Sequence, residues 1–245
     1  MARESSLQET LNSAIEHHFE NFHFSIPAIV VRADLANMQV DVQPSLNLKM
    51  FDGSGAVERP TILNVPLQFP VSKTAGMTFP VDKGDTVLLI FSERGLDSWK
   101  AGNGYPVTPT DFRMLDYKDA IAIAGIQPPG VSVNNPTKHV LTHDPKDTVL
   151  FAGLGSVEAE IRLKQDGSIE INTSNCPVTI NASDVTVNAN NSINLNAQNL
   201  VVDSVNTTWV GNIQHTGNFT SVGVQTFNGV IFSTHKHGSS PPPSN

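Results

Sequence analysis

Lysine and arginine are missing from the whole stretch between Asp166 and His235. In the complete chain, 15 lysines and arginines stand against 23 aspartates and glutamates, the formal net charge is −8, and no basic run occurs. Proteins that bind nucleic acids neutralise phosphate groups with clustered basic side chains. The composition therefore argues against nucleic acid as a partner.

Cysteine is nearly absent as well, because Cys176 stands alone. It can form neither a disulfide within the chain nor a metal motif with a second thiol, and we expect a small buried or half-buried filler. No apolar run approaches the roughly 20 residues that a membrane-spanning helix needs. Residues 1–11 are neither basic nor apolar enough for a secretory signal. We therefore expect synthesis and folding in the cytoplasm.

Charged residues make up 16% and aromatic residues 7% of the chain, whereas it contains 17 glycines and 16 prolines. This balance favours turns and strands over helices. A chain of 245 residues is long enough for one large or two modest domains. We predict an all-β fold built from two unlike regions.

A helix is predicted from Ser5 to Phe22. Apolar side chains recur at every fourth position from Leu7 to Phe19, and a serine is available as its N-cap. Such a helix usually packs on its own domain, but its aromatic end also suits docking to a larger assembly. Packing on its own domain is the favoured interpretation and docking is the second, and residues 1–24 are assigned to an N-terminal helix or attachment segment.

Residues 25–126 have the pattern of a small barrel. Short alternating segments are separated by prolines and turn residues, as in the predicted hairpin at 34–37. The apolar segment 86–91 is typical of a strand covered on both faces, and 119–123 predicts a strand that returns to the barrel. We expect Trp99 to pack inward. About five short strands fit an OB-fold barrel, which we interpret as an adaptor domain.

Residues 127–148 are rich in proline, glycine and asparagine and are predicted to be a linker. His139 and His143, together with Asp144 and Asp147, could form a site within it. A charged loop between domains is the favoured interpretation.

A repeat of apolar pairs follows a hairpin signal at Gln165–Gly167. Residues two apart lie on the same face of a strand, and small polar residues fill the intervals between the pairs. One chain supplies too few such strands to enclose a core, whereas three copies around an axis give each level three faces. We predict an intertwined homotrimeric β-helix shaft over residues 149–210. The pairs are Ile169/Ile171, Val178/Ile180, Val185/Val187, Ile193/Leu195 and Leu200/Val202.

The predicted shaft carries very little charge. After Asp166, only Glu170, Asp184 and Asp203 are charged before His235. A buried charge in hydrocarbon costs several kcal/mol, so a polar surface with few charges lowers the barrier to entering a membrane. Its hydroxyl and amide groups would still require an external driving force for passage.

Residues 211–245 are predicted to form an apex that ends with His235 and His237. Two imidazoles from one chain are a weak metal signal. On a threefold axis, however, six imidazoles would suit an octahedral transition-metal ion such as Fe(II), with Ni, Co and Zn as alternatives. With all six positions filled, such an ion would be structural and would pin three strand ends together.

The order of these features resembles the central baseplate spike proteins of contractile-tailed phages. The resemblance covers essentially the whole chain, and the terminal His-X-His-Gly after a β repeat is its most specific motif. The matching residues are Pro80–Phe91 (PVDKGDTVLLIF) with Trp99 in the barrel, Lys164–Ile169 (KQDGSI) at the shaft entry, and Thr234–Gly238 (THKHG) at the end.

This resemblance implies a non-enzymatic needle at the tip of a phage tail that pierces the host outer membrane. It implies a virion location, attachment of the N-terminal domain to a baseplate hub protein, and transient contact with the outer membrane. It also implies one iron ion per trimer, held by His235 and His237 of three chains.

Two alternatives remain open. A trimeric β-helix could be a tailspike-like enzyme that degrades cell-surface glycan, but such enzymes need two carboxylates across a groove. Asp184 and Asp203 have no acidic neighbour in the sequence and sit among small residues. The same physics would also suit the spike tip of a contractile secretion system.

Overall fold

The structure is a computed structural model that describes residues 6–20, 22–49, 55–228 and 230–231. The chain divides into two compact units between Ile180 and Asn181. The described elements are mostly strands, with few helices, as predicted. Within the described ranges, neither helix has the length and hydrophobicity that crossing a bilayer requires.

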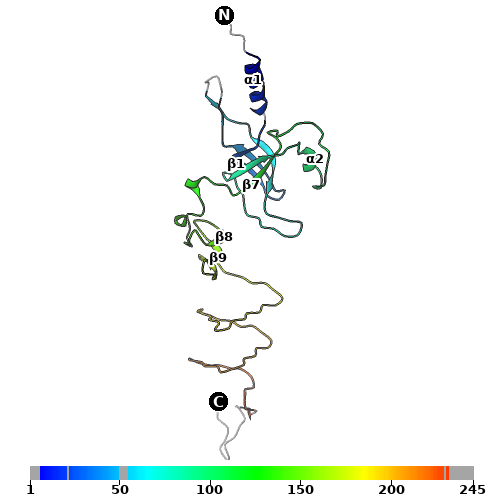
Figure 1. The fold of residues 1–245 in the computed structure, drawn as a ribbon. Coiled ribbons are helices and arrows are strands. Elements are labelled where there is room, and N and C mark those ends of the chain that lie inside the picture. Colours follow the sequence, from blue (N-terminus) through cyan, green and yellow to red (C-terminus); the bar gives the residue numbers. More distant parts are fainter. Residues whose placement is uncertain (1–5, 21, 50–54, 229, 232–245) are drawn as a thin grey trace, which may run out of the picture. The chain divides into compact units, whose positions relative to one another are not determined.

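The predicted N-terminal helix is present as α1 (Leu7–Glu20) (Figure 1). The backbone N–H of Glu9 donates to Oγ of Ser6, and the backbone N–H of Ser6 donates to Oε2 of Glu9. This reciprocal pair is a capping box, which satisfies two backbone donors at the start of the helix. The cap explains why the helix begins after Ser6.

A closed barrel forms the centre of the first unit (Figure 1). Its neighbouring strands follow the order β1-β2-β5-β7-β6, with β5 parallel to β7 and every other pair antiparallel. This five-stranded, OB-like barrel confirms the barrel prediction. Its strands are β1 (Ser25–Asp34), β2 (Gln39–Pro44), β5 (Ile62–Gln68), β6 (Thr86–Phe91) and β7 (Ala120–Ala124).

Alternation in the barrel strands produces the core. Residues that point inward are almost fully buried, among them Val30 and Val42 at 0% exposure. The predicted hairpin joins β1 to β2, with its turn at residues 35–38 rather than 34–37, because Asp34 is still part of β1. Two short strands, β3 (Leu48–Lys49) and β4 (Ala56–Val57), pair with each other outside the barrel. Four of the barrel strands (β1, β2, β5 and β6) thus precede residue 92, and β7 closes the barrel between β5 and β6.

Two details of the barrel prediction are wrong. Strand β6 is buried on alternate residues only, and Ile90 is 42% exposed, because a barrel strand turns one face inward and the other outward. Trp99 is 41% exposed rather than packed inward. It lies on α2 (Asp97–Lys100), a single turn with no buried residue.

The long connection between β6 and β7 is held by Arg113. Its Nε lies 2.6 Å from Oδ2 of Asp119, which is 1% exposed, and its Nη2 lies 2.6 Å from Oδ2 of Asp97. Burial raises the pKa of the Asp119 carboxyl, but hydrogen bonds from Arg113 and from the backbone N–H of Leu96 outweigh burial, so the pKa lies below its ordinary value. The ionised carboxylate therefore anchors this loop to the barrel.

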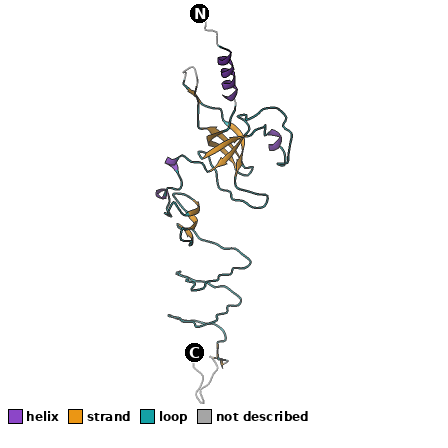
Figure 2. Ribbon diagram, in the orientation of Figure 1, coloured by secondary structure: helices purple, strands orange, loops and turns teal. Residues whose placement is uncertain are grey.

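A second sheet follows the barrel in the chain (Figure 2). Its antiparallel strands are β8 (Thr148–Ala152), β9 (Ala159–Leu163) and β10 (Ile169–Thr173), with β9 in the centre. The predicted turn at Gln165–Gly167 joins β9 to β10. The segment before this sheet contains two single-turn 3-10 helices, η1 (Pro129–Val131) and η2 (Pro136–Lys138).

After β10 the single chain forms no strand until β11 (Thr226–Phe227), which pairs with β12 (Val230–Ile231) (Figure 2). The β8–β10 part of the predicted shaft is an antiparallel sheet, whereas residues 174–225 consist of loops and bends without ladder partners. The intertwined β-helix and the trimer therefore stay predictions.

Candidate assembly site

The apolar pairs of the repeat lie in solvent in the single chain. All ten members of the five predicted pairs are between 57% and 73% exposed. Strand-like backbone usually satisfies its N–H and C=O groups through a ladder, but no strand occurs between residues 174 and 225. This stretch thus has both apolar side chains and backbone groups available for partners.

The stretch becomes more apolar and more exposed towards its end. Val205, Val210 and Val222 are each at least 97% exposed, and Trp209 is 70% exposed. Soluble monomers rarely present contiguous apolar surface of this extent. Cys176 is also exposed in the single chain, which corrects the prediction of a buried or half-buried filler.

The predicted metal ligands His235 and His237 lie outside the described residues. Within the described ranges, no group of three or more histidine, cysteine, aspartate or glutamate side chains could hold a metal ion. The site that these two histidines would form between chains therefore stays a prediction.

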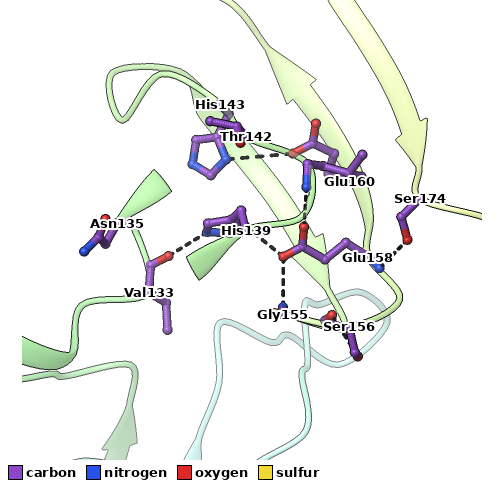
Figure 3. Close-up of polar contacts among 12 residues, drawn as sticks. Val133, Asn135, His139, Thr142, His143, Gly155, Ser156, Glu158, Glu160 and Ser174 are labelled. Carbon is purple, nitrogen blue, oxygen red and sulfur yellow. Dashed lines mark hydrogen bonds and ion pairs between the residues drawn. The ribbon is translucent and has the colours of Figure 1, made fainter. Parts of the chain in front are cut away.

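A buried polar cluster anchors the segment that precedes the second sheet (Figure 3). Glu158 and Glu160 are two residues apart and point to the same face, where they are 1% and 4% exposed. His139 and His143 come from the preceding segment and are 8% and 5% exposed. Their rings pack edge to face, with centroids 4.5 Å apart.

Glu158 lies at the centre of this cluster. Its Oε2 accepts a hydrogen bond of 2.7 Å from the backbone N–H of Leu141, and its Oε1 accepts one of 3.3 Å from Gly155. Burial raises the pKa of this carboxyl, but the backbone donors and the nearby His139 outweigh burial and hold the pKa below its ordinary value. Glu158 is therefore an ionised carboxylate that ties together two segments of the chain.

His139 bridges Glu158 and the backbone. Its Nε2 lies 2.7 Å from the carbonyl oxygen of Val133, so this nitrogen has to be the donor. Its Nδ1 lies 3.1 Å from Oε1 of Glu158 and forms an ion pair when the ring carries a second proton (Figure 3). The ring thereby connects residue 133 to the loop and strand that follow β8.

Glu160 and Arg162 extend the polar layer. Oε1 of Glu160 accepts hydrogen bonds from Arg162 and from Nδ2 of Asn172, the latter at 2.9 Å. Nδ1 of His143 lies 3.9 Å from Oε2 of Glu160, and neither atom has a hydrogen-bond partner. The cluster is thus buried but only partly hydrogen-bonded, since Nδ1 of His139 and Nε of Arg162 also lack hydrogen-bond partners.

The sequence interpretation missed this cluster. It treated His139 and His143 as part of a charged loop, together with Asp144 and Asp147, whereas both histidines are buried and Asp144 is exposed. The available signal was the Glu-Ala-Glu alternation at residues 158–160. It places two carboxylates on one face of a strand and calls for buried partners.

Two comparisons with known proteins bear on this arrangement. A search of curated proteins found no match to the chain. Residues 26–125, which contain nearly all of the barrel, match the family model described as the N-terminal domain of phage protein Gp138. A phage-protein domain that coincides with the closed barrel supports a phage structural protein and a virion component.

Proposed function

We propose that this protein is a homotrimeric, non-enzymatic needle of a contractile phage tail that pierces the host outer membrane. The observation that carries the proposal is the stretch 174–225, whose apolar pairs are exposed and whose backbone forms no ladder within one chain. The phage-domain match of residues 26–125 supports the biological setting.

Threefold assembly accounts for this stretch better than a single chain does. Three copies give each level of short strands partners for their backbone groups and bury the apolar pairs on a common axis. Closure by symmetry also removes the open strand edges that promote aggregation. The proposed shaft therefore depends on three chains folding together.

The proposed passage through a membrane follows from the composition of this stretch. Between residues 174 and 225, only Asp184 and Asp203 carry a formal charge. Once the apolar pairs face the axis, the outside would consist of small polar side chains. Such a surface still costs free energy in lipid, and contraction of the tail would supply the work.

We assign attachment to a baseplate hub protein to the N-terminal domain. In α1, Leu7, Leu11, Ile15 and Phe19 form a stripe whose members are between 53% and 77% exposed. A stripe at this spacing suits a helix that lies against a partner. In a tail needle, this partner would be the baseplate hub protein.

At the other end of the proposed needle, His235 and His237 of three chains would hold one iron ion. Six imidazoles fill an octahedral site and leave no position for substrate, so the ion would be structural. Its contribution would be to fix three chain segments to one another.

The experiment that tests this function is complementation of a phage that lacks the protein. The wild-type protein should restore plaques. A variant with Val187→Asp and Leu195→Asp, which places charges in the proposed shaft core, should give at least about 100-fold fewer plaques. The matched control, Asn188→Asp with Asn196→Asp, adds the same charge at the neighbouring polar positions, which alternation turns to the opposite face, and should restore plaques. Equal plaque counts for both variants would overturn the proposal.

A further inference from the structure

Both nitrogens of the His139 ring face oxygen atoms (Figure 3). Nε2 lies 2.7 Å from the carbonyl oxygen of Val133, which can only accept, and Nδ1 lies 3.1 Å from Oε1 of Glu158. A neutral imidazole carries one proton, so its other nitrogen would present a lone pair to an oxygen. Both side chains are almost fully buried, so bulk water does not screen this contact. A doubly protonated ring suits both neighbours.

His143 repeats this arrangement at longer distances. Its Nε2 lies 3.4 Å from Oδ1 of Asn134, whose Nδ2 donates to the carbonyl oxygen of Pro145. Its Nδ1 lies 3.9 Å from Oε2 of Glu160, and neither atom has a hydrogen-bond partner. The two histidine rings lie edge to face with centroids 4.5 Å apart, so a positive charge on one ring opposes a second on the other. The pair thus suits a single additional proton.

The charges around the rings also call for one more proton. The cluster contains two buried carboxylates, Glu158 and Glu160, and the guanidinium of Arg162, which sum to −1 when both rings are neutral. On β10, Glu170 lies 3.6 Å from Arg162, but Lys164 balances its charge at 3.1 Å. Strand β8 has no charged residue. The charged residues of the segment before β8 lie outside this cluster, since they are exposed or accept hydrogen bonds from Gln165: Lys138, Asp144, Lys146 and Asp147.

We infer that this histidine–glutamate cluster is a pH-sensitive latch, which takes up one proton when the segment from Val133 to His143 docks on the β8–β10 sheet. A buried cluster with an uncompensated charge is costly, whereas one imidazolium brings the sum to zero. Because the two rings are in contact, the proton belongs to the pair and not to one histidine. The latch therefore holds in weakly acidic solution and loosens as the pH rises.

The direction of the pH dependence follows from the number of bound protons. A histidine in water loses its second proton around pH 6.5. Above this pH the docked form binds one proton more than the undocked form, so undocking becomes easier by up to about tenfold for each pH unit. The two backbone hydrogen bonds to Glu158 do not need this proton, so docking weakens but persists. On the acid side, docking weakens when the Glu158 carboxyl, whose pKa lies below 4.5, is protonated.

Such a latch would control the connection between the barrel and the second sheet. Residues 127–148 follow the last barrel strand and precede β8, and their composition is that of a linker. Docking through the buried cluster holds them in place. When the latch opens, they would become the linker that their composition predicts.

Hydrogen exchange of the full-length protein at a series of pH values tests the latch. The amide of Leu141 reports on docking, because it donates to Oε2 of Glu158. The amide of Val30, which donates to the carbonyl oxygen of Asp85 in the barrel, is the internal control. After correction for the intrinsic pH dependence of exchange, protection at Leu141 should fall at least about tenfold from about pH 6 to about pH 8. Protection at Val30 should change less than about twofold.

A double variant tests whether the two histidines carry the proton. His139→Gln with His143→Gln keeps a donor on each side chain but removes both titrating rings, and the fall in Leu141 protection should shrink to less than about twofold. His215→Gln, at an exposed histidine of the same chain, should retain the full fall. Equal protection at both pH values in the wild type, or an undiminished fall in the double variant, would overturn the latch.

Nuclear magnetic resonance of the wild type with carbon-labelled histidine rings gives an answer even where the double variant does not fold. The buried pair should keep one additional proton at a pH at which the exposed ring of His215 has already lost its own. Loss of both additional protons at or below the pH at which His215 titrates would overturn the latch.

Discussion

Nδ1 of His139 lies 3.1 Å from Oε1 of Glu158, and both side chains are almost completely buried, each with 1% of its surface exposed. The contact joins the segment before β8 to the start of β9. The Glu158 carboxylate also accepts hydrogen bonds from the backbone N–H groups of Leu141 and Gly155, and a buried polar group that loses such partners is costly. This pair therefore holds residues 127–148 against the sheet, although the sequence pattern predicts them to be a linker between domains.

Glu158→Gln should destabilise this region at neutral pH by about 1–3 kcal/mol, because the amide has only one acceptor oxygen for the two backbone N–H groups that donate to the carboxylate. Amide hydrogen exchange at Leu141 and Gly155, whose N–H groups donate to Glu158, should become faster. Glu93→Gln is the matched control, since the Glu93 side chain is 77% exposed. Equal exchange in both variants would contradict the assigned role.

The loss of stability caused by Glu158→Gln should depend on pH. The pKa of Glu158 in the folded protein lies below its ordinary value of 4.5, so its stabilising contribution is fully present above pH 4.5 and is lost as the pH falls through the folded-state pKa. The stability difference between wild type and Glu158→Gln should therefore narrow as the pH falls below 4.5. Chemical denaturation at a series of pH values measures this, and a constant difference would be inconsistent with an ionised Glu158.

Asp119→Asn should destabilise the barrel by about 1–3 kcal/mol, because the amide retains one acceptor oxygen where the carboxylate accepts from both Arg113 and the backbone N–H of Leu96. Asp111→Asn removes a partner of the same arginine, but the Asp111 side chain is 43% exposed, and the expected loss is below about 1 kcal/mol. Urea denaturation of the two variants gives the comparison. A larger effect at Asp111 would show that the anchor is misassigned.

The barrel and the first helix could be predicted because their signals are local. Alternation and turn residues indicate β1 and β2, apolar segments indicate β6 and β7, and the apolar spacing indicates α1. The alternation of Glu158 and Glu160 indicates two carboxylates on one face, but it does not identify His139 as a partner, because the two residues are nineteen positions apart and meet only in the folded chain. The prediction that Trp99 packs inward is wrong, because the short helix α2 on which it lies has no buried residue.

The apolar pairs illustrate a different limit. Their alternation predicts short strands, but the single chain forms no strand between residues 174 and 225. Periodicity reports which side chains share a face and not which molecule covers that face. The step from exposed pairs to a threefold shaft therefore depends on a physical argument about burial.

Replacing both His235 and His237 by alanine should remove iron from the purified protein, because the proposed site has no other ligands. Elemental analysis of wild type and variant measures the metal content, which should fall from one iron per three chains to background. His215→Ala is the control, since His215 is an exposed histidine of the same chain. Iron retained in the double variant would exclude these residues as its ligands.

Sedimentation equilibrium of the full-length wild-type protein tests the central claim most directly. A homotrimer predicts a mass three times that of the 26.4 kDa chain, over a range of protein concentrations. The Val187→Asp/Leu195→Asp variant should shift towards the mass of a single chain. A wild-type protein that sediments as one 26.4 kDa chain at all concentrations would contradict the trimeric needle.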